Sequence, residues 1–113
     1  MQKKTMPSIE YLRYACTAFF SHKWQLDILY EIFDSPKHFG ELLRLNSGIS
    51  KKMLSSNLKK LETKGVIKRT SYADGAVVRV EYSLTEEGVK LKEILTSLAE
   101  WGMENQPKIQ DNK

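Results

Sequence analysis

Residues 48–64 read Gly-Ile-Ser-Lys-Lys-Met-Leu-Ser-Ser-Asn-Leu-Lys-Lys-Leu-Glu-Thr-Lys. Leu54, Leu58 and Leu61 recur at the spacing of one helical face, which predicts that this face packs against a core. Ser50 is a favoured N-cap, because its hydroxyl can accept a hydrogen bond from a free amide of the first turn. Lysines and serines occupy the opposite side. The segment is therefore predicted to be a short helix with a basic, hydroxyl-rich surface.

The residues around this helix predict a helix-turn-helix followed by a hairpin. A short helix is predicted over 39–45, and the turn formers at 46–48 connect it to the next helix, so that the motif covers 39–64. Gly65 is typical of the left-handed residue that ends a helix. From there to residue 83 apolar and polar residues alternate with period two around an Asp-Gly turn, which predicts a β-hairpin over 66–83.

Three further helices complete the predicted order. They cover 8–20, about 23–33, where Trp24 is expected in the core, and 85–104, which Thr85 caps. The first and last carry more large apolar residues than one small core requires, so we expect them to dimerise; simple packing within one chain is the alternative. The expected interface residues are Tyr11, Tyr14, Phe20, Leu95, Leu98 and Trp101.

The predicted fold is mainly α with a small β-hairpin, in the order α-α-α-α-β-β-α. Helix-turn-helix followed directly by a hairpin is the winged helix-turn-helix arrangement, in which the hairpin is the wing. The length of 113 residues fits a single domain over 1–113.

Composition excludes several classes of function. One cysteine and two histidines cannot form an intrachain disulfide or a cysteine metal cluster, and we expect no metal and no cofactor. No apolar run approaches the roughly 20 residues of a membrane span, and the N-terminus does not resemble a secretory signal. A cytoplasmic protein without a membrane partner is expected. With no glycine-rich phosphate loop and no nucleophile beside a base, we expect no enzyme.

The positive charge is concentrated around the capped helix. The net charge is only +4, yet residues 37–72 hold nine lysines and arginines against two acidic residues. Double-stranded DNA is the simplest partner for such a segment. The alternative is a winged helix that binds RNA or another protein. The expected DNA contacts are Ser50, Lys51, Lys52, Ser55, Ser56 and Lys59 on the helix, Arg69, Tyr72 and Arg79 on the wing, and Lys23.

Each of these contacts has a simpler alternative. The helix could merely present a solvated face, Arg79 could pair with a nearby acid across the hairpin, and Lys23 could be an ordinary surface lysine. The turn, the wing and the charge segregation favour DNA contact for the helix. Individual base assignments do not follow from the sequence.

Five separated motifs follow one another along the chain: His22-Lys23-Trp24 with Ile28-Leu29, Phe39-Gly40-Glu41-Leu42, Gly48-Ile49-Ser50 with Leu54, Leu58, Leu61 and Glu62, Gly65-Val66-Ile67-Lys68-Arg69, and Val80-Glu81-Tyr82-Ser83-Leu84-Thr85 with Gly88. In this order they resemble the HxlR-type winged helix-turn-helix transcriptional regulators over roughly residues 9–102. The resemblance implies a bacterial homodimer that binds a pseudo-palindromic operator.

The chain departs from this family at three places. Tyr11-Leu12 stands where the family commonly has a Cys-Pro pair, which some members use as a thiol sensor. That role does not transfer to Cys16, which we expect to be a small buried residue; a redox switch is the alternative. Val77-Val78 replaces a proline of the returning wing strand, and His38 replaces an arginine. A small-molecule or redox effector is left unidentified.

Overall fold

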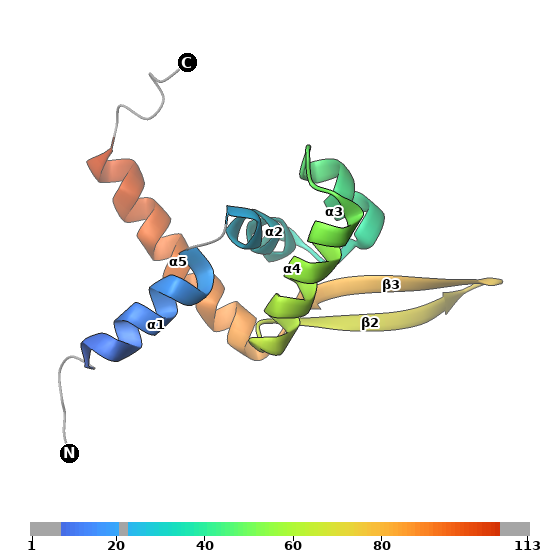
Figure 1. Ribbon diagram of the computed structural model, residues 1–113, viewed down its shortest axis with the longest axis horizontal. Helices are drawn as coiled ribbons and strands as arrows, with labels where there is room; N and C mark the ends of the chain where they lie inside the picture. Colours follow the sequence, from blue (N-terminus) through green and yellow to red (C-terminus); the bar gives the residue numbers. More distant parts are fainter. Residues whose placement is uncertain (1–7, 21–22, 107–113) are drawn as a thin grey trace.

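The computed structural model describes residues 8–20 and 23–106. It contains five helices and a three-stranded antiparallel sheet, which confirms the predicted winged helix-turn-helix order (Figure 1). In that part of the chain no helix is long and apolar enough to cross a membrane. The elements are α1 (Ile9–Phe20), α2 (Lys23–Asp34), β1 (Lys37–His38), α3 (Phe39–Leu45), α4 (Lys51–Thr63), β2 (Ile67–Asp74), β3 (Val77–Leu84) and α5 (Glu86–Asn105).

The core lies where α2, α3 and α4 meet the base of the sheet. The predicted leucine face of α4 is fully buried there, and Ile28, Leu29 and Leu42 pack against it. Trp24, which was expected in the core, packs against this cluster. It remains half-buried because it stands near the exposed start of α2. Burial of each large aliphatic side chain contributes roughly 1.5–3 kcal/mol. The orientation of α4 is therefore fixed by its apolar side.

The hairpin formed by β2 and β3 is much longer than β1, the third strand of the sheet. β2 pairs with β3 from Ile67–Leu84 to Asp74–Val77, and Gly75 makes the tight turn with a φ of 68°. The strand order is β1-β3-β2. The sequence did not predict β1, which has only two residues and pairs with β3 through Lys37–Tyr82 and His38–Glu81. Past that short strand the wing projects away from the helices (Figure 1).

The start of α5 is fixed against the base of the wing. The Thr85 hydroxyl caps α5 by accepting from the Gly88 amide at 3.0 Å, and it donates to the Gly65 carbonyl at 2.6 Å. The Thr85 amide donates to the Val66 carbonyl at 3.1 Å. Gly88 packs so closely there that a Cβ would lie 2.1 Å from the Val66 carbonyl oxygen. This close approach requires a glycine.

The α1 helix extends away from the core, and only its last turn is partly covered by the rest of the chain (Figure 1). The expectation that Cys16 is buried is wrong for the single subunit, where its side chain is exposed. The periodicity of α1 correctly indicated an apolar face, but this chain does not cover that face.

We expect Gly88→Ala to destabilise the protein, because the added methyl group would collide with the Val66 carbonyl and displace α5 from the wing. Overpacking of this kind costs about 1–3 kcal/mol, which thermal and urea unfolding would measure. The matched control is Gly40→Ala in α3, where the nearest atom is 3.8 Å away in a flexible arginine. The control should leave the melting temperature unchanged or slightly higher; an equal loss in both variants would contradict the role of the close approach.

Candidate nucleic-acid interface

The α4 helix presents its basic side to solvent. Its start is capped by Ser50, whose hydroxyl oxygen accepts from the Met53 amide at 3.0 Å and whose own proton remains available to a phosphate. All six residues expected to contact DNA at this helix are exposed, and Lys52, Ser55, Ser56 and Lys59 lie away from its leucine face. Within the described residues no ion pair engages Lys51, Lys52 or Lys59. These ammonium groups are therefore available to neutralise an anion.

A hollow of about 420 Å³ lies between the first turn of α2 and the exposed side of α4. Lys23, Lys52 and Lys60 converge on it, with Ser56 between them. The Lys23 ammonium lies 3.8 Å from the centroid of the Trp24 ring and 3.7 Å from an Asp27 carboxylate oxygen, so one acid partly offsets its charge. The structure thus brings Lys23 to the same surface as α4. It also adds Lys60, which the sequence did not single out.

The wing residues differ in whether their side chains already bind another residue. Arg69 is exposed on β2. The Arg79 guanidinium donates to Asp74 at 2.6 Å, which is the cross-strand pair that the sequence allowed as an alternative. This bond and the nearby negative charge raise the pKa of Arg79. Arg79 can meet a phosphate only by sharing or leaving Asp74.

The third wing residue, Tyr72, is joined to β1 through His38. The Nδ1 atom of His38 lies 3.0 Å from the Val80 carbonyl oxygen, and its Nε2 atom lies 3.3 Å from the Tyr72 hydroxyl. A neutral ring protonated on Nδ1 satisfies both partners, since the carbonyl can only accept and the phenol then donates to Nε2. His38 therefore connects the wing to the helix-turn-helix, a role that the sequence did not reveal.

Part of the basic segment faces the interior. The Lys37 ammonium donates to the Glu31 carbonyl at 2.9 Å and to the Ser35 hydroxyl at 2.8 Å. The Lys64 ammonium is likewise engaged with helices α1 and α2. Neither contributes to the exposed face of α4, so the charge presented by this segment is smaller than the sequence suggested.

A family model described as HxlR-like helix-turn-helix matches residues 19–110. The chain belongs to this family. An uncharacterized HTH-type transcriptional regulator of Halalkalibacterium halodurans is 45% identical to this HxlR-like chain over 85 residues, which cover 74% of each protein.

Solved structures of regulators share the fold of this HxlR-like chain. A protein described as a transcriptional regulator of the MarR family, from Enterococcus faecalis V583, superposes with a TM-score of 0.83 at 32% identity and covers 96% of both chains. The redox regulator HypR in its reduced form gives a TM-score of 0.76 at 31% identity, covering 89% of this chain and 98% of HypR. The HxlR-like chain is a DNA-binding transcriptional regulator with a winged helix fold.

The residues expected at a dimer interface do not all behave alike. Tyr11, Tyr14, Leu98 and Trp101 are exposed on α1 and α5. Leu95 is half-buried, because it packs against the subunit's own core while also facing a groove. Phe20 ends α1, and its side chain lies outside the described part of the chain.

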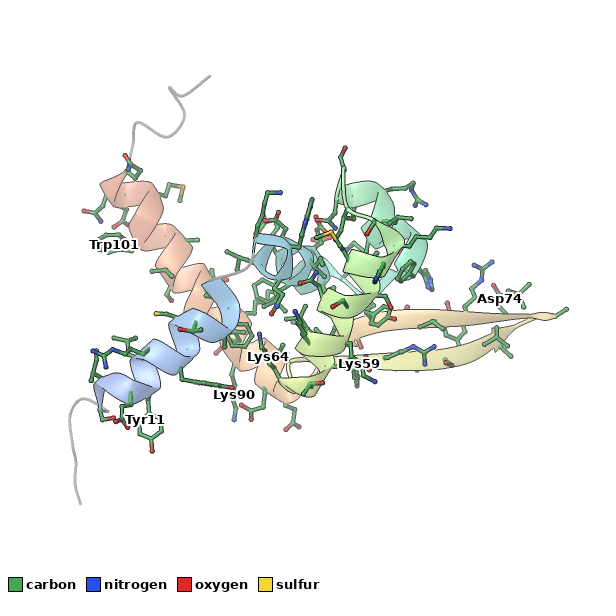
Figure 2. All side chains as sticks on the ribbon, viewed as in Figure 1. Tyr11, Lys59, Lys64, Asp74, Lys90 and Trp101 are labelled. Atoms are coloured by element: carbon green, nitrogen blue, oxygen red, sulfur yellow. The ribbon has the colours of Figure 1, made fainter. Side chains whose placement is uncertain are left out.

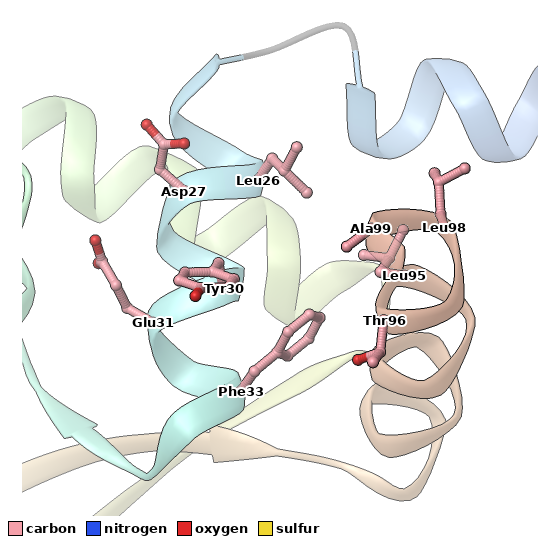
Figure 3. Close-up of a pocket in the computed structure, with 9 residues that line it drawn as sticks. All are labelled: Leu26, Asp27, Tyr30, Glu31, Phe33, Leu95, Thr96, Leu98 and Ala99. Atoms are coloured by element: carbon pink, nitrogen blue, oxygen red, sulfur yellow. The ribbon is translucent and has the colours of Figure 1, made fainter. Parts of the chain in front are cut away.

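That groove separates α2 from α5 and has a volume of about 540 Å³. Figure 3 shows apolar side chains of both helices facing it, with carboxylates at one edge. One of these acids, Glu31, accepts from the Asn46 amide at 2.7 Å, which would lower its pKa; burial outweighs this bond and raises the pKa of Glu31. The lining residues are Leu26, Asp27, Tyr30, Glu31, Phe33, Leu95, Thr96, Leu98 and Ala99.

We expect Lys52→Ala and Lys59→Ala each to weaken DNA binding and to flatten its salt dependence, because each would remove one phosphate contact. The slope of log K against log salt should fall in magnitude by about 0.9 per lost contact, measured by fluorescence anisotropy at several salt concentrations. Lys90→Ala on α5, which removes an exposed lysine paired with Glu87, is the control and should keep the slope. An unchanged slope for both α4 variants would remove them from the interface.

A second prediction concerns the wing. Asp74→Asn should free the Arg79 guanidinium and remove a negative charge, so DNA binding should tighten several-fold and the salt slope should steepen by about 0.9. Glu87→Gln makes the same change of charge and frees Lys90 on α5, where no effect is expected. Equal responses in the two variants would indicate a general charge effect rather than a wing contact.

Proposed function

We propose that this regulator binds a pseudo-palindromic operator as a homodimer. Helix α4 of each subunit enters a major groove, while the two wings contact the flanking minor groove or its phosphates. The observation that carries the proposal is the exposed side of α4, where lysines that meet no acidic partner in the described part of the chain lie beside serine hydroxyls. Lysines neutralise phosphates or reach guanine edges, and serine hydroxyls can bond to phosphate or base.

The exposed apolar surface of α1 and α5 supports the proposal that a second subunit binds there. Tyr11 is 70% exposed and Trp101 is 63% exposed, and Ile94 and Leu98 add to the same two helices. The labelled ends of this surface, at Tyr11 and Trp101, lie on the side of the molecule away from the wing (Figure 2). An extended apolar surface on a small regulator marks an interaction site.

The position of this surface suits DNA reading. With the partner bound on the side of α1 and α5, both wings point outward and the two α4 helices stand on either side of the two-fold axis. Such dimers read half-sites one helical turn apart, about 34 Å from centre to centre. A signal would act by changing the geometry between the two α4 helices. The thiol-responsive alternative rests on Cys16 alone.

The operator is tested first by selecting bound fragments from genomic DNA with the purified protein at physiological salt. We expect enrichment of an inverted repeat with half-sites about one helical turn apart. Uniform binding of all fragments that disappears as salt rises would indicate backbone attraction only and would contradict the operator proposal.

The dimer is tested separately by sedimentation. Trp101→Glu should convert the protein to monomers, because a carboxylate would be buried in an apolar interface. Val78→Glu makes the same kind of change at an equally exposed apolar residue on the wing, 71% exposed, and should leave the dimer intact. A wild-type protein that sediments as a monomer at micromolar concentration would contradict the proposed assembly.

A further inference from the structure

Lys64 follows the last turn of α4, and its side chain turns inward (Figure 2). Its ammonium donates to the carbonyl oxygen of Ala18 in α1 and to the side-chain oxygen of Gln25 in α2, the latter at 2.6 Å. The same nitrogen lies 5.1 Å from the centroid of the Phe19 ring. One side chain at the end of the reading helix thus contacts both preceding helices.

The two hydrogen-bond acceptors explain why the Lys64 ammonium is stable between α1 and α2. The Ala18 carbonyl is one of the last four carbonyl groups of α1. These groups lack hydrogen-bond partners within the helix and form the negative end of its dipole. Gln25 is only 1% exposed, and its side-chain oxygen is occupied by Lys64, while its nitrogen has no partner within the described residues. Burial lowers the pKa of Lys64, and the nearby Lys60 lowers it further. The cost of burying the charge is offset only while these acceptors remain in place.

These contacts hold the last turn of α1 to its own subunit. Among the side chains of α1 that the structure describes, residues 9–17 are exposed, whereas Ala18 and Phe19 are half-buried. The direction of α1 therefore depends strongly on the contacts around its last turn. Lys64 supplies polar contacts that connect this turn directly to α4.

We propose that Lys64 is a positioning residue for operator binding, which fixes the direction of α1 relative to α4 and thereby the half-site spacing that the dimer accepts. This inference rests on the proposed dimer. A helix of 12 residues is about 18 Å long at 1.5 Å per residue. A rotation of about 10° at its fixed end moves the other end by roughly 3 Å, which is close to the 3.4 Å rise of one base pair. A small rotation of α1 about its contact with Lys64 is therefore large enough to change the half-site spacing by about one base pair.

The test uses Lys64→Met, which keeps the aliphatic stem and removes the donors. Its affinity is measured on duplexes carrying the selected inverted repeat with the natural spacing and with one base pair added or removed. We expect the dimer to persist and affinity at the natural spacing to fall about tenfold, while at least one altered spacing is bound as well as or better than before. Lys64→Arg, which retains a donor cation, should restore the preference for the natural spacing.

Lys60→Met is the matched control, since it removes an exposed lysine one turn earlier without touching Ala18 or Gln25. It should weaken binding equally at all three spacings and flatten the salt slope. If Lys64→Met behaves in the same way, or keeps the wild-type preference, Lys64 does not position the helices. If Lys64→Met fails to fold, Gln25→Met removes an acceptor from the same group and should change the spacing preference too; an unchanged preference overturns the proposal.

If the dimer proposal itself is wrong, the experiments give a different result from the one expected if only the role of Lys64 is wrong. A wild-type protein that is monomeric, or that binds all three spacings alike, contradicts the proposed assembly itself. A wild-type dimer with a clear spacing preference that survives in Lys64→Met and Gln25→Met leaves that assembly intact and overturns only the role of Lys64.

Discussion

Burial of Leu54, Leu58 and Leu61 decides which side of α4 faces solvent. Because these three side chains are fully buried against α2 and α3, rotating the helix about its axis would expose leucine and bury lysine. Both changes are costly, since a buried ammonium without acceptors is strongly unfavourable. The basic surface therefore has a fixed orientation relative to the core, and the wing and α5 are built onto that same core.

The lysines of the basic segment serve two separate purposes. Those on the outer side of α4 meet no acid within the described chain and are free for phosphates. Lys37 and Lys64 instead satisfy carbonyls at the ends of α2 and α1, and Lys92 of α5 does the same for the Phe33 carbonyl at 3.0 Å. Cations at helix C-termini compensate the unpaired carbonyls and the helix dipole. Net charge along the sequence therefore overstates the charge that faces DNA.

Features with a local physical cause could be predicted from the sequence. The caps at Ser50 and Thr85, the left-handed Gly65 with a φ of 81°, and the hairpin turn at Gly75 all follow from neighbouring residues, and the structure contains each of them. The two-residue strand β1 could not be predicted, because two residues carry no periodicity and their partners are more than 40 positions away.

The contacts of His38 and Lys64 that the sequence missed also depend on distant parts of the chain. The bond between His38 and Tyr72 spans 34 positions, and that between Lys64 and Ala18 spans 46. An apolar face, such as that of α1 around Cys16, indicates burial without telling whether this subunit or another covers it. Assignment of individual residues to DNA remains a prediction.

The wing has a consequence for the protein in the absence of DNA. Among the described residues, β2 pairs only with β3, and the part of β3 between Glu81 and the turn pairs only with β2. Unpaired strand edges are templates for adding a strand from another molecule, which leads to aggregation. Val77 and Val78 stand where the family usually has a proline, which would remove one backbone amide from this strand. Lys68 and Arg69 place like charges on the outer strand, so two wings that approach edge to edge repel each other. The charges of Lys68 and Arg69 thus disfavour an intermolecular sheet between two unbound regulators.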